Sequence, residues 1–358
     1  MGDVVTSDLV TGDLVTGGLG DVVAGEVLAP YLHAQASDFL RSLRLNRESG
    51  QDPQGAADAV EAAAALRRSA RRISGTLHTF RPLTDTSWAD PLRTELAWLS
   101  GTLAREHAYA ARLARLLDAL TRLSGPGSQP APPAGPVPGA RGGGGGGGGA
   151  QPGGSLTVGA ARAGALLERQ LTLARTRAHS AALQALGSSR FHAVADAVAL
   201  LASDVPLGPA AAAPAAEVLV PLAVGAEQRL LEAVAALPLG RAAHPYNAEA
   251  LVHGLAAAPS SEAQDAPWHQ VRLLLRLHRY AQELVGAPAD TLLAAQALDR
   301  HRDAAEAAGA AASAARTPRI APATAYALGV LHADQRHEVE AARFAFQQVW
   351  QGAAVATS

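Results

Sequence analysis

The stretch that decides the fold spans residues 268–283 and reads Trp268-His269-Gln270-Val271-Arg272-Leu273-Leu274-Leu275-Arg276-Leu277-His278-Arg279-Tyr280-Ala281-Gln282-Glu283. At about 100° per residue of an α-helix, an arc of about 80° holds four basic side chains, those of His269, Arg272, Arg276 and Arg279. No acidic residue lies between Asp265 and Glu283. Like charges at this spacing repel one another, so the pattern predicts a helix whose basic face meets an anionic partner.

A second stretch of the chain repeats this pattern, and no acidic residue lies between Glu61 and Asp85. Its basic side chains share or border one helix face about 80° wide, and they are Arg67, Arg68, Arg71, Arg72, His78 and Arg81. Arg67 and Arg71 recur 205 positions later as Arg272 and Arg276, and residues 103–108 resemble residues 298–303. The two halves therefore predict a duplicated helical bundle.

Two further segments carry sparser basic stripes at heptad-like spacing. These stripes consist of Arg162, Arg169 and Arg177, and of His332, Arg336 and Arg343. A single arginine stripe is usually a solvated surface, which is the simplest alternative. A solvated face normally mixes Glu with Arg at i±4, however, and the two densest stretches do not. The four stripes together predict several helices that point Arg side chains into one groove.

The composition favours an all-α fold. Hydrophobic residues make up 48% of the 358 residues but aromatic residues only 4%, so the apolar fraction is mostly Ala, Leu and Val, which suits packed helices. The absence of Cys excludes disulfides, thiolate metal sites and Cys nucleophiles. With 30 basic and 32 acidic residues the net charge is −2, which argues against a protein that coats nucleic acid with a uniformly positive surface. The basic residues apart from His are all Arg, which suits bidentate contacts with oxyanions.

The organisation along the chain follows from Gly, Pro and apolar periodicity. We expect a flexible tail over 1–24, for which an edge strand or docking peptide is the alternative, and a disordered Gly/Pro-rich insert over 125–154. One helical block covers 25–124, bridging helices cover 155–205, and a second block covers 206–351. Ser49-Gly50, Pro82 and Asp90-Pro91 are expected to interrupt the first block. The expected helices are roughly 26–45, 54–80, 88–103 and 104–123 (which could run together), 157–186, a helix ending at 202, 215–237, 247–256, 266–286, 289–315 and 322–350.

The stretch 268–283 resembles the second repeat of the CHAD family, the conserved histidine α-helical domain. The family signature there is close to H-x-x-R-x-x-x-K-x-x-R-Y-x-x-E, and only Arg276 departs from it. Arg302-Asp303 matches the family's Arg-Asp pair, and residues 327–332 and 344–350 resemble its closing helix. The first repeat keeps Arg67, Arg71, Arg72 and Phe80 but has Ala64 at the eponymous His position, Ser74 at the last motif Arg, and His107-Ala108 at the Arg-Asp pair.

The resemblance covers roughly residues 25–351 apart from the insert. It implies two four-helix-bundle-like repeats related by pseudo-twofold symmetry, with a groove that binds inorganic polyphosphate. The two helical blocks would then be the first and second CHAD repeats. The expected binding residues are Arg67, Arg71, Arg72, His78, Arg81, Arg162, Arg169, His269, Arg272, Arg276, Arg279, Tyr280, Arg302, His332, Arg336 and Arg343. Because the first repeat is thinned out, the second is expected to contribute more.

The expected function is polyphosphate binding, which could target the protein to polyphosphate granules. The alternative is a structural or interaction protein of storage granules that has lost polyanion binding. Catalysis is not expected, because the basic stretches lack clustered carboxylates for metal ions and the run of glycines lacks the Gly-Lys-Ser/Thr ending of a phosphate-binding loop. We expect no metal, no cofactor, no specific nucleic acid and no membrane contact, in a cytoplasmic protein without signal peptide or spanning helix. The oligomeric state is not predicted.

Overall fold

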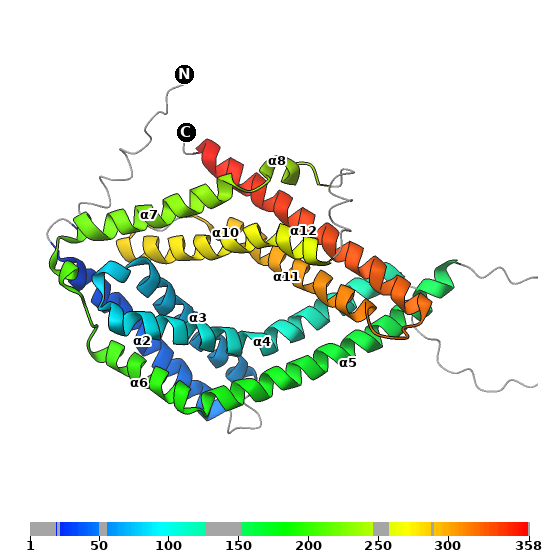
Figure 1. The fold of residues 1–358 in the computed structure, drawn as a ribbon, viewed down its shortest axis with the longest axis horizontal. Coiled ribbons are helices and arrows are strands. Elements are labelled where there is room, and N and C mark those ends of the chain that lie inside the picture. Colours follow the sequence, from blue (N-terminus) through cyan, green and yellow to red (C-terminus); the bar gives the residue numbers. More distant parts are fainter. Residues whose placement is uncertain are drawn as a thin grey trace, which may run out of the picture.

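The computed structural model describes residues 19, 22–49, 56–125, 152–245, 258–287 and 290–356. This part of the chain is all-α, which confirms the fold class predicted from composition (Figure 1). Its α-helices are α2 (Ala24–Ser49), α3 (Ala56–Thr79), α4 (Thr86–Ser124), α5 (Pro152–Leu186), α6 (Ser189–Ser203), α7 (Ala215–Ala235), α8 (Leu239–Ala242), α10 (Ala258–Val285), α11 (Leu292–Ala315) and α12 (Pro322–Ala356). Two short 3-10 turns join them, η1 (Arg81–Leu83) and η2 (Pro209–Ala212).

Helix α4 is continuous, so the break expected at Asp90-Pro91 does not occur. The helix begins at Thr86, where the side chain of the N-cap residue Asp85 accepts a hydrogen bond from the backbone N–H of Ser87 at 2.9 Å. Pro91 lies in the second turn and cannot donate a hydrogen bond to the carbonyl of Ser87, but the helix continues through it. The segments expected at 88–103 and 104–123 therefore form one helix of 39 residues.

Three apolar clusters hold the described helices together. The first joins α2, α3, the first half of α4, α6 and α7 around Phe39 and Phe191. The second joins the second half of α4 to α5, α11 and α12. The third joins α7, α8, α10, α11 and α12 around Trp268 and Phe346. Helix α10 contributes Val271 to the third cluster and Ala281 to the first, so it connects two cores.

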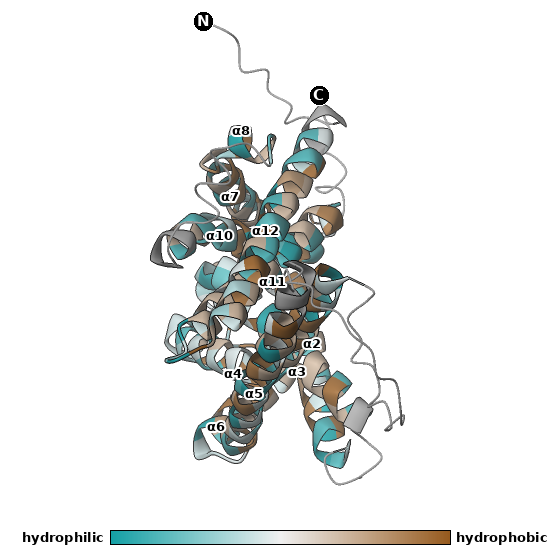
Figure 2. Ribbon diagram, turned by 90° about the vertical axis from the view of Figure 1, so that its right-hand side faces the viewer, coloured by the Kyte–Doolittle hydropathy of each residue, from teal (hydrophilic) through white to brown (hydrophobic). Residues whose placement is uncertain are grey.

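The helices are amphipathic, and apolar and polar residues alternate along their ribbons in Figure 2. Within the described ranges no helix is both long enough and apolar enough to cross a membrane. The pseudo-twofold relation between two repeats stays a prediction. Most of the predicted tail and insert, and the helix predicted over 247–256, lie outside the described residues.

Candidate functional site

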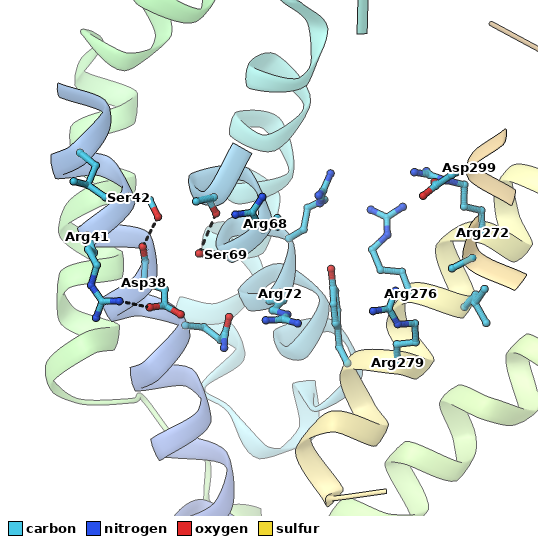
Figure 3. Close-up of a pocket in the computed structure, with 17 residues that line it drawn as sticks. Asp38, Arg41, Ser42, Arg68, Ser69, Arg72, Arg272, Arg276, Arg279 and Asp299 are labelled. Carbon is cyan, nitrogen blue, oxygen red and sulfur yellow. Dashed lines mark hydrogen bonds and ion pairs between the residues drawn. The ribbon is translucent and has the colours of Figure 1, made fainter. Parts of the chain in front are cut away.

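The two basic helix faces predicted from the sequence meet in one pocket of about 660 Å³. Helix α3 lines one side and α10 the other, and residues of α2 and α11 complete the wall. Figure 3 shows Arg68 and Arg72 on one side of the opening and Arg276 and Arg279 on the other. Seven arginines line the pocket, and they are Arg41, Arg68, Arg71, Arg72, Arg272, Arg276 and Arg279.

Three of these arginines have no directly bonded partner among the described residues. Arg71, Arg276 and Arg279 form no hydrogen bond or ion pair with any part of the chain that the structure describes, and Nε of Arg71 is buried without a partner. Burial lowers the pKa of Arg276 to about 10, and the positive charge of Arg272 adds to this effect. Burial also lowers the pKa of Arg71. An anion in the pocket would relieve both the desolvation and the repulsion.

The other four pocket arginines face carboxylates. Nη1 of Arg41 lies 3.1 Å from Asp38, and Nη2 of Arg72 lies 3.3 Å from Glu283. Arg68 pairs with Glu61 and Arg272 with Asp299. In each pair at least one side chain is well exposed to solvent. Such pairs contribute about 0–1 kcal/mol, so a phosphate oxygen can replace the carboxylate at little cost.

Three more of the predicted residues lie in or near the pocket. Tyr280 lines it with only 8% of its surface exposed, and the guanidinium carbon of Arg72 lies 5.8 Å from the centre of its ring. Arg67 is half-buried and unpaired among the described residues, and burial together with the charge of Arg302 lowers its pKa. Arg302 itself donates to Asp303 on the same helix. Arg67 thus adds a cation beside the pocket, whereas the charge of Arg302 on α11 is paired with a carboxylate.

Four predicted residues of the first half of the chain lie outside the pocket. Nη1 of Arg93 lies 3.1 Å from Nδ1 of His78, so His78 faces α4. Arg81 in η1 donates to both oxygens of Asp90, at 2.7–3.1 Å. Arg162 and Arg169 lie on the exposed face of α5 and do not line the pocket.

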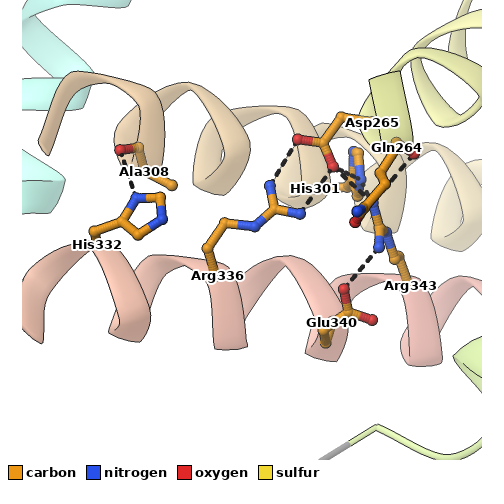
Figure 4. Close-up of polar contacts among 8 residues, drawn as sticks. All are labelled: Gln264, Asp265, His301, Ala308, His332, Arg336, Glu340 and Arg343. Carbon is orange, nitrogen blue, oxygen red and sulfur yellow. Dashed lines mark hydrogen bonds and ion pairs between the residues drawn. The ribbon is translucent and has the colours of Figure 1, made fainter. Parts of the chain in front are cut away.

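The stripe of α12 does not face the pocket either, because its arginines are buried against α10 (Figure 4). Nη1 of Arg336 donates to Asp265 at 2.7 Å, and Nη2 of Arg343 donates to the same carboxylate at 2.6 Å. Arg343 also donates to Glu340. Nδ1 of His332 lies 3.0 Å from the carbonyl oxygen of Ala308 and donates to it. The predicted groove stripe on α12 thus forms internal contacts between helices.

His269 lies at the edge of this buried network. Its ring centre is 5.4 Å from that of His301, whose ring stacks on Trp268. Burial lowers the pKa of His301 to about 4, so its ring is neutral at pH 7. Burial alone would raise the pKa of Asp265, but hydrogen bonds with His301 and Arg336 hold it well below its usual range.

Sequence reasoning missed the contributions of α2 and α11 to the pocket. Arg41 and Gln35 line it from α2, and Asp299 lines it from α11. The available signal was weak, since Arg41, Arg44 and Arg47 recur at three-residue spacing but Asp38 and Glu48 mix acids into the same helix. At the family's arginine position in the first repeat, the hydroxyl of Ser74 donates to the backbone of Arg93. Arg68, which also borders this face of α3, lines the pocket.

A family model described as the CHAD domain matches residues 34–309, which is more than half of the chain. The chain belongs to the CHAD domain family. A solved structure of PptA from Streptomyces chartreusis is similar to this CHAD protein, with 62% sequence identity and a TM-score of 0.73. The alignment covers 92% of this chain and 100% of PptA. No curated protein matches the chain.

Proposed function

We propose that this CHAD protein binds inorganic polyphosphate in the arginine-lined pocket between α3 and α10. One observation carries the proposal: Arg71, Arg276 and Arg279 converge on the pocket without a partner among the described residues. Burial depresses the pKa of the first two, as expected for charges that lack a counter-ion. The ligand that such a site favours is a flexible anion with many oxygens.

Polyphosphate has the required chemistry. It carries about one negative charge per phosphoryl unit, and each unit offers oxygens that an arginine can contact through two N–H groups at once. A row of such contacts also releases counter-ions from the polyanion, as on a nucleic-acid backbone. The two arginine walls supply this row from both sides of one pocket.

Single-stranded nucleic acid fits the pocket less well. Proteins that bind single strands offer exposed aromatic rings on which bases stack. The aromatic residue in the pocket wall is Tyr280, and its ring is 8% exposed and covered by Arg72. The pocket therefore offers contacts to phosphate but no open surface for a base.

We further propose that the pocket binds its ligand without chemical turnover. Its carboxylates, Asp38 and Asp299, each face an arginine of the same wall. The two carboxylates stand on different helices, and within the described ranges no group of three or more acidic or His side chains could hold a metal ion. Binding of this kind would carry the protein to polyphosphate granules.

The test is a titration of the full chain with long-chain polyphosphate. We expect Arg71→Ala combined with Arg276→Ala to weaken binding about 100-fold or more, since each charge-assisted contact contributes on the order of 1.5–3 kcal/mol. The matched control is Arg177→Ala combined with Arg229→Ala, which removes two exposed arginines outside the pocket and changes the net charge equally. Equal affinity of both double variants would contradict the proposed site, and absence of binding by the unmodified chain would favour a granule scaffold that no longer binds polyanions.

A further inference from the structure

Helices α3 and α10 touch at a glycine. Gly75 lies in the interior of α3, three and four residues after Arg72 and Arg71, and therefore close to the face that these arginines use. A Cβ atom at Gly75 would lie 2.7 Å from Cδ2 of Tyr280 and 3.1 Å from its Cε2. Glycine destabilises a helix interior relative to alanine. The close approach of Tyr280 explains why glycine nevertheless occupies this position.

The aromatic partner of Gly75 cannot easily move aside. Tyr280 is 8% exposed, its ring closely approaches α3 at Gly75, and the guanidinium carbon of Arg72 lies 5.8 Å from the ring centre. Leu277 contacts the same point, with its Cδ2 at 3.2 Å from the position of the added Cβ. A side chain at position 75 must therefore push α10 away from α3 or displace the ring into the pocket.

This contact is positioned to control the pocket. Tyr280 follows Arg276 by four residues and Arg272 by eight, so all three lie on adjoining parts of one face of α10. On α3, Gly75 follows the arginine row by a single turn. The contact thus lies directly beside the two rows of arginines and at one end of both.

We propose that the contact between Gly75 and Tyr280 is a spacer that sets the separation of the two arginine rows. At this separation a single polyphosphate chain contacts α3 and α10 at the same time. Gly75 is then a positioning residue, and this role rests on the proposed function because it concerns the same pocket.

The test is Gly75→Ala in the full chain. Long-chain polyphosphate, which can contact both rows, should lose at least about 10-fold in affinity, whereas tripolyphosphate, which contacts few arginines at a time, should lose less than about 3-fold. The control is Gly101→Ala in α4, where an added Cβ meets no atom within 4 Å. Because the chain has no cysteine, spin labels at Val60→Cys on α3 and Gln270→Cys on α10 report the separation of the helices without further changes.

The expected result is a longer or broader label distance in Gly75→Ala together with the selective loss of long-chain affinity. An unchanged label distance, or an equal loss of affinity for long-chain polyphosphate and tripolyphosphate, would contradict the role of Gly75 as a spacer. If Gly75→Ala does not fold, Tyr280→Leu is the second variant, because it shortens the α10 side chain of the contact without causing a clash. The distribution of label distances between α3 and α10 should then broaden. A narrow, unchanged distribution in Tyr280→Leu overturns the proposal. If the unmodified chain binds no polyphosphate, the proposed function fails first, and the distances alone then show whether Gly75 sets the spacing.

Discussion

At the scale of single residues, Arg276 and Arg336 show how two arginines of the same chemistry acquire different roles. Arg336 is 2% exposed, and its guanidinium contacts both oxygens of Asp265, at 2.7 and 3.3 Å. Arg276 is half-buried and has no such partner among the described residues. A buried cation that meets a carboxylate is already satisfied, whereas one without a partner gains from an external anion. The two arginines differ in burial as well, but it is the absence of a carboxylate partner that leaves Arg276 able to bind an external anion.

The buried His301 predicts a dependence of stability on pH. Its pKa is lowered by burial to about 4, so the unfolded chain, with a pKa near 6.5, binds this proton more readily. His301 therefore does not reduce the free energy of unfolding above about pH 6.5. As the pH drops toward 4 it lowers that free energy, by on the order of 2 kcal/mol at pH 5. Urea unfolding of the wild type and of His301→Gln, each at pH 7.5 and at pH 5, measures this loss of unfolding free energy. The variant should lose less stability on acidification, and identical losses would contradict the assignment.

At the scale of elements, the carboxylate of Asp265 on α10 connects α10 to α12 and α11. Arg336 and Arg343 both donate to it from α12, and His301 of α11 lies 3.5 Å away. Three helices of the second half of the chain thus share one buried charge. We regard this cluster as structural, although the sequence predicted its two arginines as ligands of polyphosphate.

Removal of one member of this cluster should destabilise the fold. Arg336→Ala leaves Asp265 with one arginine fewer in a buried site, and the expected loss is about 3–5 kcal/mol of the free energy of unfolding. Arg279→Ala, at an exposed and unpaired pocket position, should change stability by less than about 0.5 kcal/mol. Urea denaturation followed by circular dichroism compares the two variants. Similar stabilities for both would show that the buried ion pairs do not support the fold.

The same elements show what the sequence could and could not predict. The faces of α3 and α10 were predictable because no acidic residue lies between Glu61 and Asp85 or between Asp265 and Glu283, and the structure brings the two faces together. The burial of α12 was not predictable from its own pattern, because the carboxylate that satisfies Arg336 lies 71 positions away in the chain. The contribution of Arg41 was hidden for a different reason, because the acid Asp38 three residues away gives this part of α2 the mixed charges of a solvated surface. Local periodicity shows which face is charged, but the tertiary partner decides what the charge does.

At the scale of the whole molecule, the pocket depends on helices from both halves of the chain. Helix α4 takes part in two apolar clusters, and it reaches the second half through ion pairs of Arg112 with Glu306 and of Arg122 with Asp334. Helix α10 likewise connects the third cluster to the first. The pocket between α3 and α10, which are in contact with each other, therefore exists only when both halves are folded together.

The central claim is that pocket arginines neutralise phosphates, and the salt dependence of binding tests it most directly. The logarithm of the association constant for long-chain polyphosphate should fall linearly with the logarithm of NaCl concentration. Each phosphate contacted should make the slope more negative by about 0.7. With seven pocket arginines the slope should be no steeper than about −5. Arg71→Ala combined with Arg276→Ala should make it shallower by about 1.4, while Arg177→Ala combined with Arg229→Ala should leave it unchanged. A flat salt dependence, or the same slope in both double variants, would contradict the claim.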